Sequence, residues 1–259
     1  HFPQYLSWMF TGRMVSEPTS IGCHTRLWDF TRNDYHNWVR REGFLQLFPE
    51  VVPTTTTFKT LVSGAEVVAG VGIHDSSSAL MAYTLKTKEP FILISTGTWS
   101  ITLNPFTTEN LTSAELQRDC LQYMSVTGKP VKASRLFLGN ELEFQIKRLG
   151  EIFHKEQNYY KQITLSEDFI RRIENRSIQN SFYPDTIRNT ALIHDIFPTN
   201  EWHPEKCLTY EDAYHQMIWG LVQLQVLSVK LAMGKTYVKK IFVDGGFAGN
   251  DIFIQLLKY

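Results

Sequence analysis

Cysteine is scarce in this sequence, and the few cysteines stand far apart. The 259 residues contain three, Cys23, Cys120 and Cys207. An odd number of cysteines without Cys-x-x-Cys or Cys–His spacing argues against both a disulfide framework and a zinc site. We therefore expect free, buried thiols, no metal held by protein ligands alone, and a cytoplasmic location.

Net charge and long apolar runs are lacking too. The 26 Lys and Arg residues balance 26 Asp and Glu residues, so no positive field would attract nucleic acid or an anionic membrane. No apolar run reaches the roughly 18 residues of a membrane-spanning helix, and we expect no signal peptide. The expected partners are small molecules, without nucleic acid or membrane, and a homodimer is left open.

Repeats, low-complexity tracts and a Walker-type GxxxxGK[ST] loop are also absent. What is present is an alternation of β-rich and amphipathic segments with 43% apolar residues, which predicts an α/β fold with a sizeable core.

Residues 155–205 are polar and irregular, and we expect a surface insertion with one helix near 166–174. Aromatic residues at the start of the chain are expected in the core: Phe2, Tyr5, Trp8 and Phe10. The expected strands cover 66–73 (buried), 91–95, 99–103, 118–125, 128–133 and 240–243, and the expected helices 3–12, 34–41, 76–83, 136–153, 210–233 and 249–257, with 16–23 as a loop or edge strand.

The first motif with chemical potential is His74-Asp75-Ser76-Ser77-Ser78, which follows the expected strand 66–73 and opens an expected helix. Chemistry in α/β folds gathers at the carboxyl ends of strands, and a carboxylate there can accept a proton from a substrate hydroxyl. The alternative is structural: Asp75 or the serines that follow it would only cap the helix. Taken alone, the motif leaves both interpretations open.

The second motif is the turn Thr96-Gly97-Thr98 between two expected strands. A tight hairpin of this composition presents hydroxyls and backbone N–H groups together, which suits phosphate oxygens. The third motif is Asp244-Gly245-Gly246 between a strand and a helix. Its glycines would allow a ligand to approach the backbone. An ordinary hairpin turn and an ordinary packing turn are the alternatives.

The order of these three motifs resembles the FGGY carbohydrate kinase family, in particular its rhamnulokinase and L-fuculokinase branch. The matching stretches are Phe2-Pro3-Gln4-Tyr5-Leu6-Ser7 with Thr11-Gly12, Glu17-Pro18-Thr19-Ser20, Leu27-Trp28-Asp29, His74-Asp75-Ser76-Ser77-Ser78-Ala79, Ser95-Thr96-Gly97-Thr98-Trp99-Ser100 and Asp244-Gly245-Gly246. The resemblance covers most of the chain and is weakest over 150–205.

This resemblance implies an actin-like ATPase fold of two domains, each with a ribonuclease-H-like α/β core. Residues 1–84 would be the C-terminal part of the first, sugar-binding domain, and 85–259 a second, nucleotide-binding domain that stops early. The implied reaction is phosphoryl transfer from ATP and magnesium to a hydroxyl of a ketose such as L-rhamnulose or L-fuculose.

The resemblance also implies roles for single residues. Asp75 would be the catalytic base, flanked by the sugar-binding residues His74 and Ser76. The residues expected to bind ATP are Thr96, Gly97, Thr98, Gly245 and Gly246. No substrate residue is carried over at Ser134-Arg135-Leu136, where this sequence departs from the family.

Members of this family begin with an Asp-x-Gly-Thr-type phosphate loop, which these residues do not contain. We therefore expect the 259-residue chain alone not to phosphorylate sugars. Two other functions stay open at this point: an actin-like or chaperone-like nucleotide-binding module, and a sugar-binding relative without catalysis.

Overall fold

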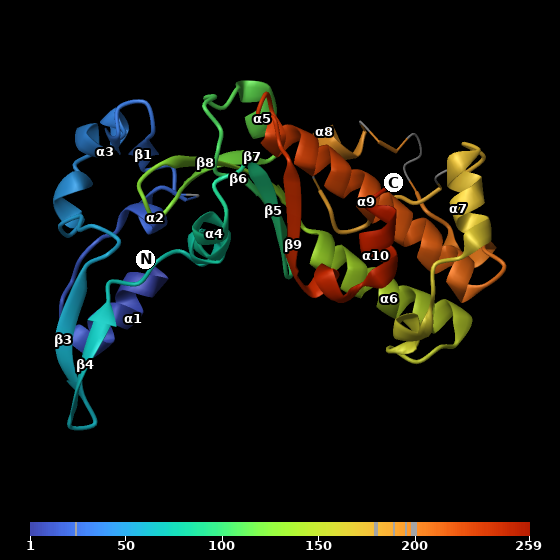
Figure 1. Ribbon diagram of the computed structural model, residues 1–259, viewed down its shortest axis with the longest axis horizontal. Coiled ribbons are helices and arrows are strands. Elements are labelled where there is room, and N and C mark those ends of the chain that lie inside the picture. The colour runs from blue at the N-terminus through green and yellow to red at the C-terminus, as the bar shows by residue number, and fades with distance from the viewer. Residues whose placement is uncertain (24, 179–180, 189, 195, 198–200) are drawn as a thin grey trace.

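A computed structural model describes residues 1–23, 25–178, 181–188, 190–194, 196–197 and 201–259. Figure 1 shows an arched molecule, with the N-terminal elements at one end, a five-stranded sheet in the middle and a group of helices at the other end. Within the described residues, no helix is both long enough and apolar enough to cross a membrane. None of the three cysteines forms a disulfide in the described structure; Cys120 is buried as expected, whereas Cys23 and Cys207 are half-buried.

The N-terminal region consists of short elements and one exposed hairpin. Helix α1 has the expected position and ends at Gly12, whose φ of 68° suits a glycine. The segment 16–23, expected as loop or edge strand, contains a helical turn instead, because the Glu17 carboxylate caps it by accepting from the N–H of Ser20. The elements are α1 (Phe2–Thr11), α2 (Pro18–Ile21), β1 (Trp28–Asp29), β2 (Asp34–Tyr35), α3 (Asn37–Arg41), η1 (Leu45–Leu47), β3 (Thr57–Val62) and β4 (Ala65–Gly70).

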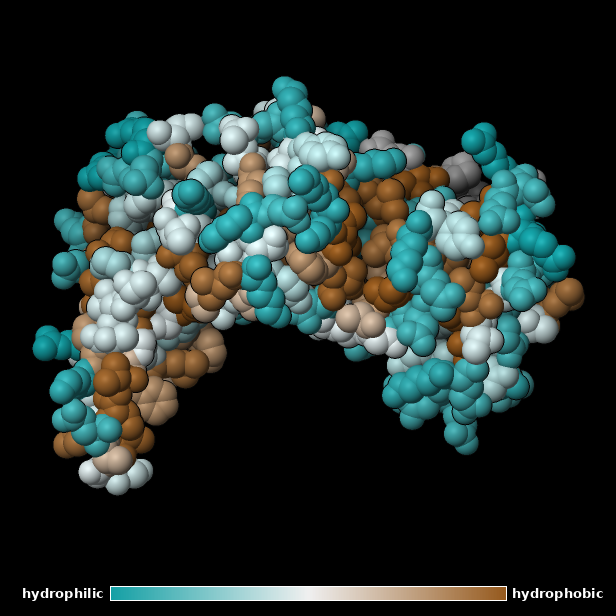
Figure 2. Space-filling model, viewed as in Figure 1, coloured by the Kyte–Doolittle hydropathy of each residue, from teal (hydrophilic) through white to brown (hydrophobic). Residues whose placement is uncertain are grey.

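Two burial predictions in this region are wrong. Strand β4 was expected to be buried, yet it pairs only with β3 in an antiparallel hairpin, and Val68 is 63% exposed. The aromatic residues of α1 are exposed as well, Phe2 by 72%. The reason is that α1 docks through its polar side: the Gln4 amide donates to the carbonyl of Gly72, and the Ser7 hydroxyl to that of Gly70. Figure 2 shows hydrophobic residues on this arm of the molecule.

The central sheet has the strand order β7-β8-β6-β5-β9. The expected hairpin is confirmed: β5 and β6 pair antiparallel around the turn at residues 97–99. Only β5 and β9 run parallel, with Thr96 opposite Gly245, so their carboxyl ends meet at one edge. The strands are β5 (Phe91–Thr96), β6 (Ser100–Asn104), β7 (Cys120–Met124), β8 (Pro130–Leu136) and β9 (Lys240–Gly245).

Helices cover both faces of this sheet (Figure 1). On one face, α4 packs Leu80 against Phe91 and Leu93. On the other face, α9 has the predicted bounds and presents Gln225, whose amide bridges Ser100 and Thr102 in a buried network. The helices are α4 (Asp75–Lys86), α5 (Ser113–Gln117), α6 (Leu138–Phe153), η2 (Tyr159–Gln162), α7 (Glu167–Glu174), α8 (Thr190–Ile193), η3 (Pro204–Lys206), α9 (Tyr210–Met233), η4 (Gly246–Gly249) and α10 (Asp251–Leu256).

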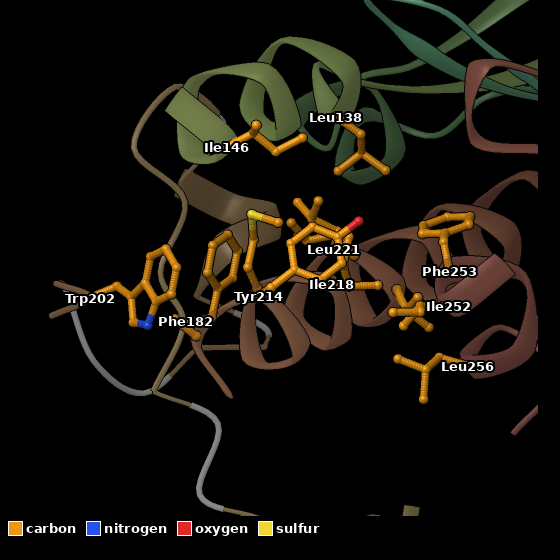
Figure 3. Packing of buried hydrophobic residues seen from close by; sticks show 14 of the residues in the cluster. Leu138, Ile146, Phe182, Trp202, Tyr214, Ile218, Leu221, Ile252, Phe253 and Leu256 are labelled. Carbon is orange, nitrogen blue, oxygen red and sulfur yellow. The ribbon is translucent and has the colours of Figure 1, made fainter. Parts of the chain in front are cut away.

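The prediction that 155–205 is a surface insertion is wrong for its second half, although α7 lies where a helix was expected. Phe182 and Trp202 are buried in the main hydrophobic cluster with rings 5.0 Å apart, and Figure 3 shows both beside Tyr214. A buried carboxylate, Glu141, fixes this segment by accepting hydrogen bonds from the backbone N–H groups of Asp185 (3.0 Å) and Thr186 (2.6 Å). The described parts of this segment that carry Phe182 and Trp202 therefore belong to the core.

Candidate active site

Three of the residues expected to bind ATP lie together at the carboxyl ends of β5 and β9. Thr96 pairs with Gly245, and Gly246 follows directly. The hydroxyl of Thr96 donates to the carbonyl of Asp244 (2.5 Å) and accepts from the N–H of Phe247 (3.0 Å). Thr96 is buried and its hydroxyl is occupied. In this structure its side chain therefore fastens the glycine turn of β9 to β5, and a phosphate contact by this hydroxyl stays a prediction.

Two close backbone contacts hold the hairpin. A Cβ at Gly245, whose φ is 83°, would lie 1.8 Å from the Thr96 carbonyl oxygen, and a Cβ at Gly139 would lie 1.9 Å from that of Gly97. The N–H of Asn140, in the first turn of α6, donates to the carbonyl of Thr98 (3.1 Å). Only glycine fits at positions 139 and 245, where the backbones of α6 and β9 pack directly against the backbone of the hairpin. The residues left exposed are Gly97, Thr98 and Trp99.

Gly246 lines a cavity of about 370 Å³. Its walls include Asn250, whose amide donates to the Tyr214 hydroxyl (2.9 Å), and Tyr160 with Lys161 from η2. Burial raises the pKa of Tyr214, so its hydroxyl stays protonated at neutral pH. A cavity that combines aromatic rings with fixed polar groups beside a glycine turn suits a flat heterocycle such as a nucleobase. Gly246 is among the residues expected from the sequence, whereas Asn250 and Tyr160 belong to none of the three motifs.

Asp75 is the first residue of α4, and its side chain is 93% exposed. One carboxylate oxygen accepts from the N–H of Ser76 (2.6 Å) and lies 3.4 Å from Nδ1 of His74. The expectation that a serine caps the helix is wrong, because the N-cap residue is His74, which makes no side-chain capping bond. A carboxylate in the first helical turn is favoured by the helix dipole, and its exposure leaves it accessible to a substrate.

His74 is held more firmly than Asp75. Its backbone N–H donates to the Thr19 hydroxyl (3.0 Å), and its ring packs edge-on against Tyr123, with centroids 5.5 Å apart. Tyr123 pairs with Val131 near one end of the β7–β8 ladder, whereas the hairpin stands where Ser100 pairs with Leu136, at the opposite end of β8. The structure brings the ATP-side residues together and His74 to Asp75. Among the described residues it records no contact between Asp75 and the hairpin.

One side chain that the sequence analysis passed over lies between these two groups. The guanidinium of Arg135 stands 5.3 Å from the centre of the Trp99 ring in the hairpin and pairs with Asp119 (2.7 Å). It also lies beside the hydroxyl of Tyr123, the residue on which His74 packs. Burial raises the pKa of Tyr123 to about 12, and the nearby guanidinium opposes that rise. A chain of contacts thus joins His74 to the hairpin through Tyr123 and Arg135.

No metal site is preformed here in the part of the chain that the structure describes: it contains no cluster of three or more His, Cys, Asp or Glu side chains. Magnesium keeps several water ligands and is commonly held by one or two carboxylates together with substrate phosphates. An exposed carboxylate such as Asp75, together with the phosphates of a bound nucleotide, would fit that form of binding.

Comparison with known proteins agrees with this architecture. Residues 88–172 match the family model "Carbohydrate kinase FGGY, C-terminal domain". The match includes the hairpin and α6, but not Asp75 or Gly245. No curated protein matches the sequence.

Solved structures resemble nearly the whole chain. A carbohydrate kinase from Novosphingobium aromaticivorans superposes on 98% of it with a TM-score of 0.74 and 23% identity, and 54% of that protein is covered. Ligand-bound xylulose kinase from Lactobacillus acidophilus gives 0.61 and 13%, and xylulose kinase from Bifidobacterium adolescentis 0.55 and 15%; each matches 98% of this chain, which covers 52% and 55% of theirs.

These likenesses define the fold. The protein has the α/β, actin-like ATPase fold of the FGGY sugar kinases, in part, because the chain spans about half the length of the solved structures it matches. The predicted fold class is confirmed.

Proposed function

We propose that this chain belongs to an ATP-dependent sugar kinase that transfers a phosphoryl group to a ketose hydroxyl. The observation that carries the proposal is the hairpin at Thr98, exposed at its tip and gripped by glycine contacts from β9 and α6. Phosphoryl transfer asks a protein mainly for positioning and charge stabilisation, and a rigid hairpin with an exposed threonine hydroxyl at its tip would contribute to both. The family match over 88–172 supports it.

The residue roles in this proposal are those that the family resemblance implies. Thr98 and Gly97 would face the ATP phosphates, and Gly245 with Gly246 would lie along the adenosine. Asp75 would accept the proton of the attacking hydroxyl, with His74 and Ser76 beside the sugar. Magnesium would come with ATP. The division into a sugar-binding part, 1–84, and a nucleotide-binding part, 85–259, is part of the same proposal, as is a cytoplasmic location.

The ketose is the finer question. The sequence motifs favour a 6-deoxy-ketose, L-rhamnulose or L-fuculose, whereas two of the similar structures are xylulose kinases. The test is ADP formation by the full-length gene product with L-rhamnulose, L-fuculose and D-xylulose. Turnover with one ketose well above the others would support the proposal and name the sugar. The absence of ketose-dependent ADP formation across a broad sugar panel would overturn it.

A nucleotide-binding module without sugar chemistry would use the same hairpin and glycine turn. Thermal unfolding separates the two functions, because a protein is stabilised by any ligand that binds its folded state. A rise in Tm with sugar as well as with ATP supports the kinase. A rise with ATP alone would favour the nucleotide-binding module.

A further inference from the structure

Arg135 and Asp119 lie between the two largest cavities described. One cavity, of about 690 Å³, lies between residues 21–38 and the sheet. The other, of about 560 Å³, lies beside Trp99 and Asn140. Both residues line both cavities. Volumes of this size are those of small-molecule sites.

The position of Arg135 is fixed from three directions. Its Nη2 donates to Asp119 (2.7 Å), its backbone N–H donates to the carbonyl of Asp119 (3.2 Å), and its guanidinium covers the Trp99 ring. Tyr123 lies on a third side. A guanidinium anchored in this way loses little rotamer entropy when a ligand binds, so its remaining donors are pre-organised.

Donors remain on both walls of the larger cavity. Arginine carries five N–H groups, and Nε of Arg135 is buried without an acceptor in the described structure. The same holds for the indole N–H of Trp28, which also lines this cavity. These two nitrogens have almost no exposed surface, so the donors available to a ligand are the remaining Nη N–H groups of Arg135, whose side chain is 25% exposed.

The two walls of this cavity differ in chemistry. Trp28, Phe30 and Trp38 come from the N-terminal region, and Asp119, Gln122 and Arg135 from β7, β8 and the turn before β7. Aromatic faces opposite planar hydrogen-bonding groups fit a sugar, which has C–H faces and a rim of hydroxyls. Arg135 and Asp119 are paired at 2.7 Å and cancel each other's charge, and Arg26 adds a further positive side chain to the lining.

The cavity is also near the candidate base. His74, the neighbour of Asp75, packs on Tyr123, and Tyr123 lies beside both Arg135 and Cys23, which line the cavity. We propose that the sugar lies in this cavity and that Arg135 is a sugar-binding residue that contributes to specificity by donating to hydroxyl oxygens. This inference rests on the proposed kinase function and names a residue that neither the motifs nor the comparisons assign.

The test is calorimetric titration of L-rhamnulose, L-fuculose and D-xylulose into the full-length gene product and its Arg135→Lys variant. Lysine keeps the positive charge but lacks the planar guanidinium with its several N–H donors, so the Kd for the sugar should rise about tenfold or more. The matched control is Arg148→Lys, because Arg148 also pairs with an aspartate (Asp185, 2.9 Å) and lies over a tryptophan (Trp202, 5.8 Å). Arg148 lines neither cavity, so its variant should keep the wild-type Kd.

A second readout reports on the cavity itself. In ¹⁵N-labelled protein, sugar should shift the indole N–H resonance of Trp28 and leave that of Trp202, which is buried in the main cluster, unchanged. Equal sugar Kd values for wild type and Arg135→Lys, or unchanged Trp28 resonances at saturation, would overturn the inference and leave the kinase proposal standing. If the wild type binds ATP but no sugar, the kinase proposal fails together with this inference.

Discussion

The two halves of the candidate site are built in opposite ways. The hairpin at Thr98 is gripped by Gly139 and Gly245 at distances that leave no space for a methyl group. Asp75 is 93% exposed, and among the described residues the donors recorded near its carboxylate are its neighbours His74 and Ser76. One half is fixed before any ligand arrives, while the other is an accessible carboxylate on a firmly placed helix end.

This difference fits a division of labour in phosphoryl transfer. The transferred group must be held in line, which asks for a rigid phosphate site that costs no reorganisation. The base needs only to reach one hydroxyl of the bound sugar, and its geometry tightens when the sugar binds. We therefore expect substitutions in the hairpin region to affect stability or nucleotide binding, and substitutions at Asp75 to affect turnover alone.

The largest expected effect is that of Asp75→Asn on turnover. Loss of a general base lowers kcat by about 10²–10⁴-fold, whereas stability should not change, because the exposed side chain bonds only to local groups. The measurements are ketose-dependent ADP formation by the full-length gene product and a urea melt. Unchanged kcat would show that Asp75 is not the base, and would favour a structural role in the first turn of α4.

Next in size is the effect of Gly245→Ala on stability. The added Cβ would lie 1.8 Å from the Thr96 carbonyl at a φ of 83°, so we expect a loss of about 3 kcal/mol or more in the free energy of unfolding. Gly246→Ala is the control next to it, since its Cβ would meet no atom within 4 Å, and its effect should stay within about 0.5 kcal/mol. Equal losses in urea denaturation would mean that the β5–β9 contact is not rigid.

The sequence predicted the rigid half better than its surroundings. The hairpin, the strand of β9 and the whole of α9 follow from local patterns: an apolar run, a Thr-Gly-Thr turn, and a helical period that ends at Gly234. Burial was harder to predict. The valines of β4 predicted a buried strand, yet α1 docks on its hairpin through polar side chains and leaves Val67 and Val68 exposed. Phe182 and Trp202 stand among polar residues, and the apolar residues around them recur with neither helical nor strand spacing. Local hydrophobicity therefore did not mark these two residues as core.

In the candidate site, too, the sequence predicted residues in local motifs but not residues that meet through tertiary packing. Asp75, Thr98 and Gly245 stand at ends of strands, where α/β folds place ligands, so position along the chain is enough to suggest them. Arg135 and Asp119 are 16 residues apart and meet only through the β7–β8 register. Asn250 and Tyr160 meet at Gly246 through the packing of η2 against α9 and α10. No local spacing encodes such contacts.

Tyr123, which lies between His74 and Arg135, gives a pH-dependent prediction. The folded state holds the pKa of Tyr123 at about 12, against 10.0 for an ordinary tyrosine. Because the pKa is raised on folding, this contribution to stability is complete below pH 10 and is lost between pH 10 and 12. Tyr123→Phe should therefore reduce the alkaline loss of stability by about 2 kcal/mol over that window. Urea melts from pH 8 to 12 check this, and curves that stay parallel to the wild type would contradict it.

The smallest effect compares two threonines of one hairpin. Thr98 is exposed, and within the described structure its hydroxyl has no hydrogen bond, whereas the Thr96 hydroxyl makes two in a buried setting. Thr98→Ala should leave the urea midpoint unchanged and raise the Kd for ATP-magnesium about tenfold, through the loss of one hydrogen bond to charged phosphate. Thr96→Ala should cost about 1–3 kcal/mol of stability, because the N–H of Phe247 loses its acceptor. Calorimetric titration and urea melts of both variants decide. If Thr98→Ala lowered stability while ATP affinity held, the exposed threonine would be the structural residue of the pair, and the hairpin would not be the phosphate site.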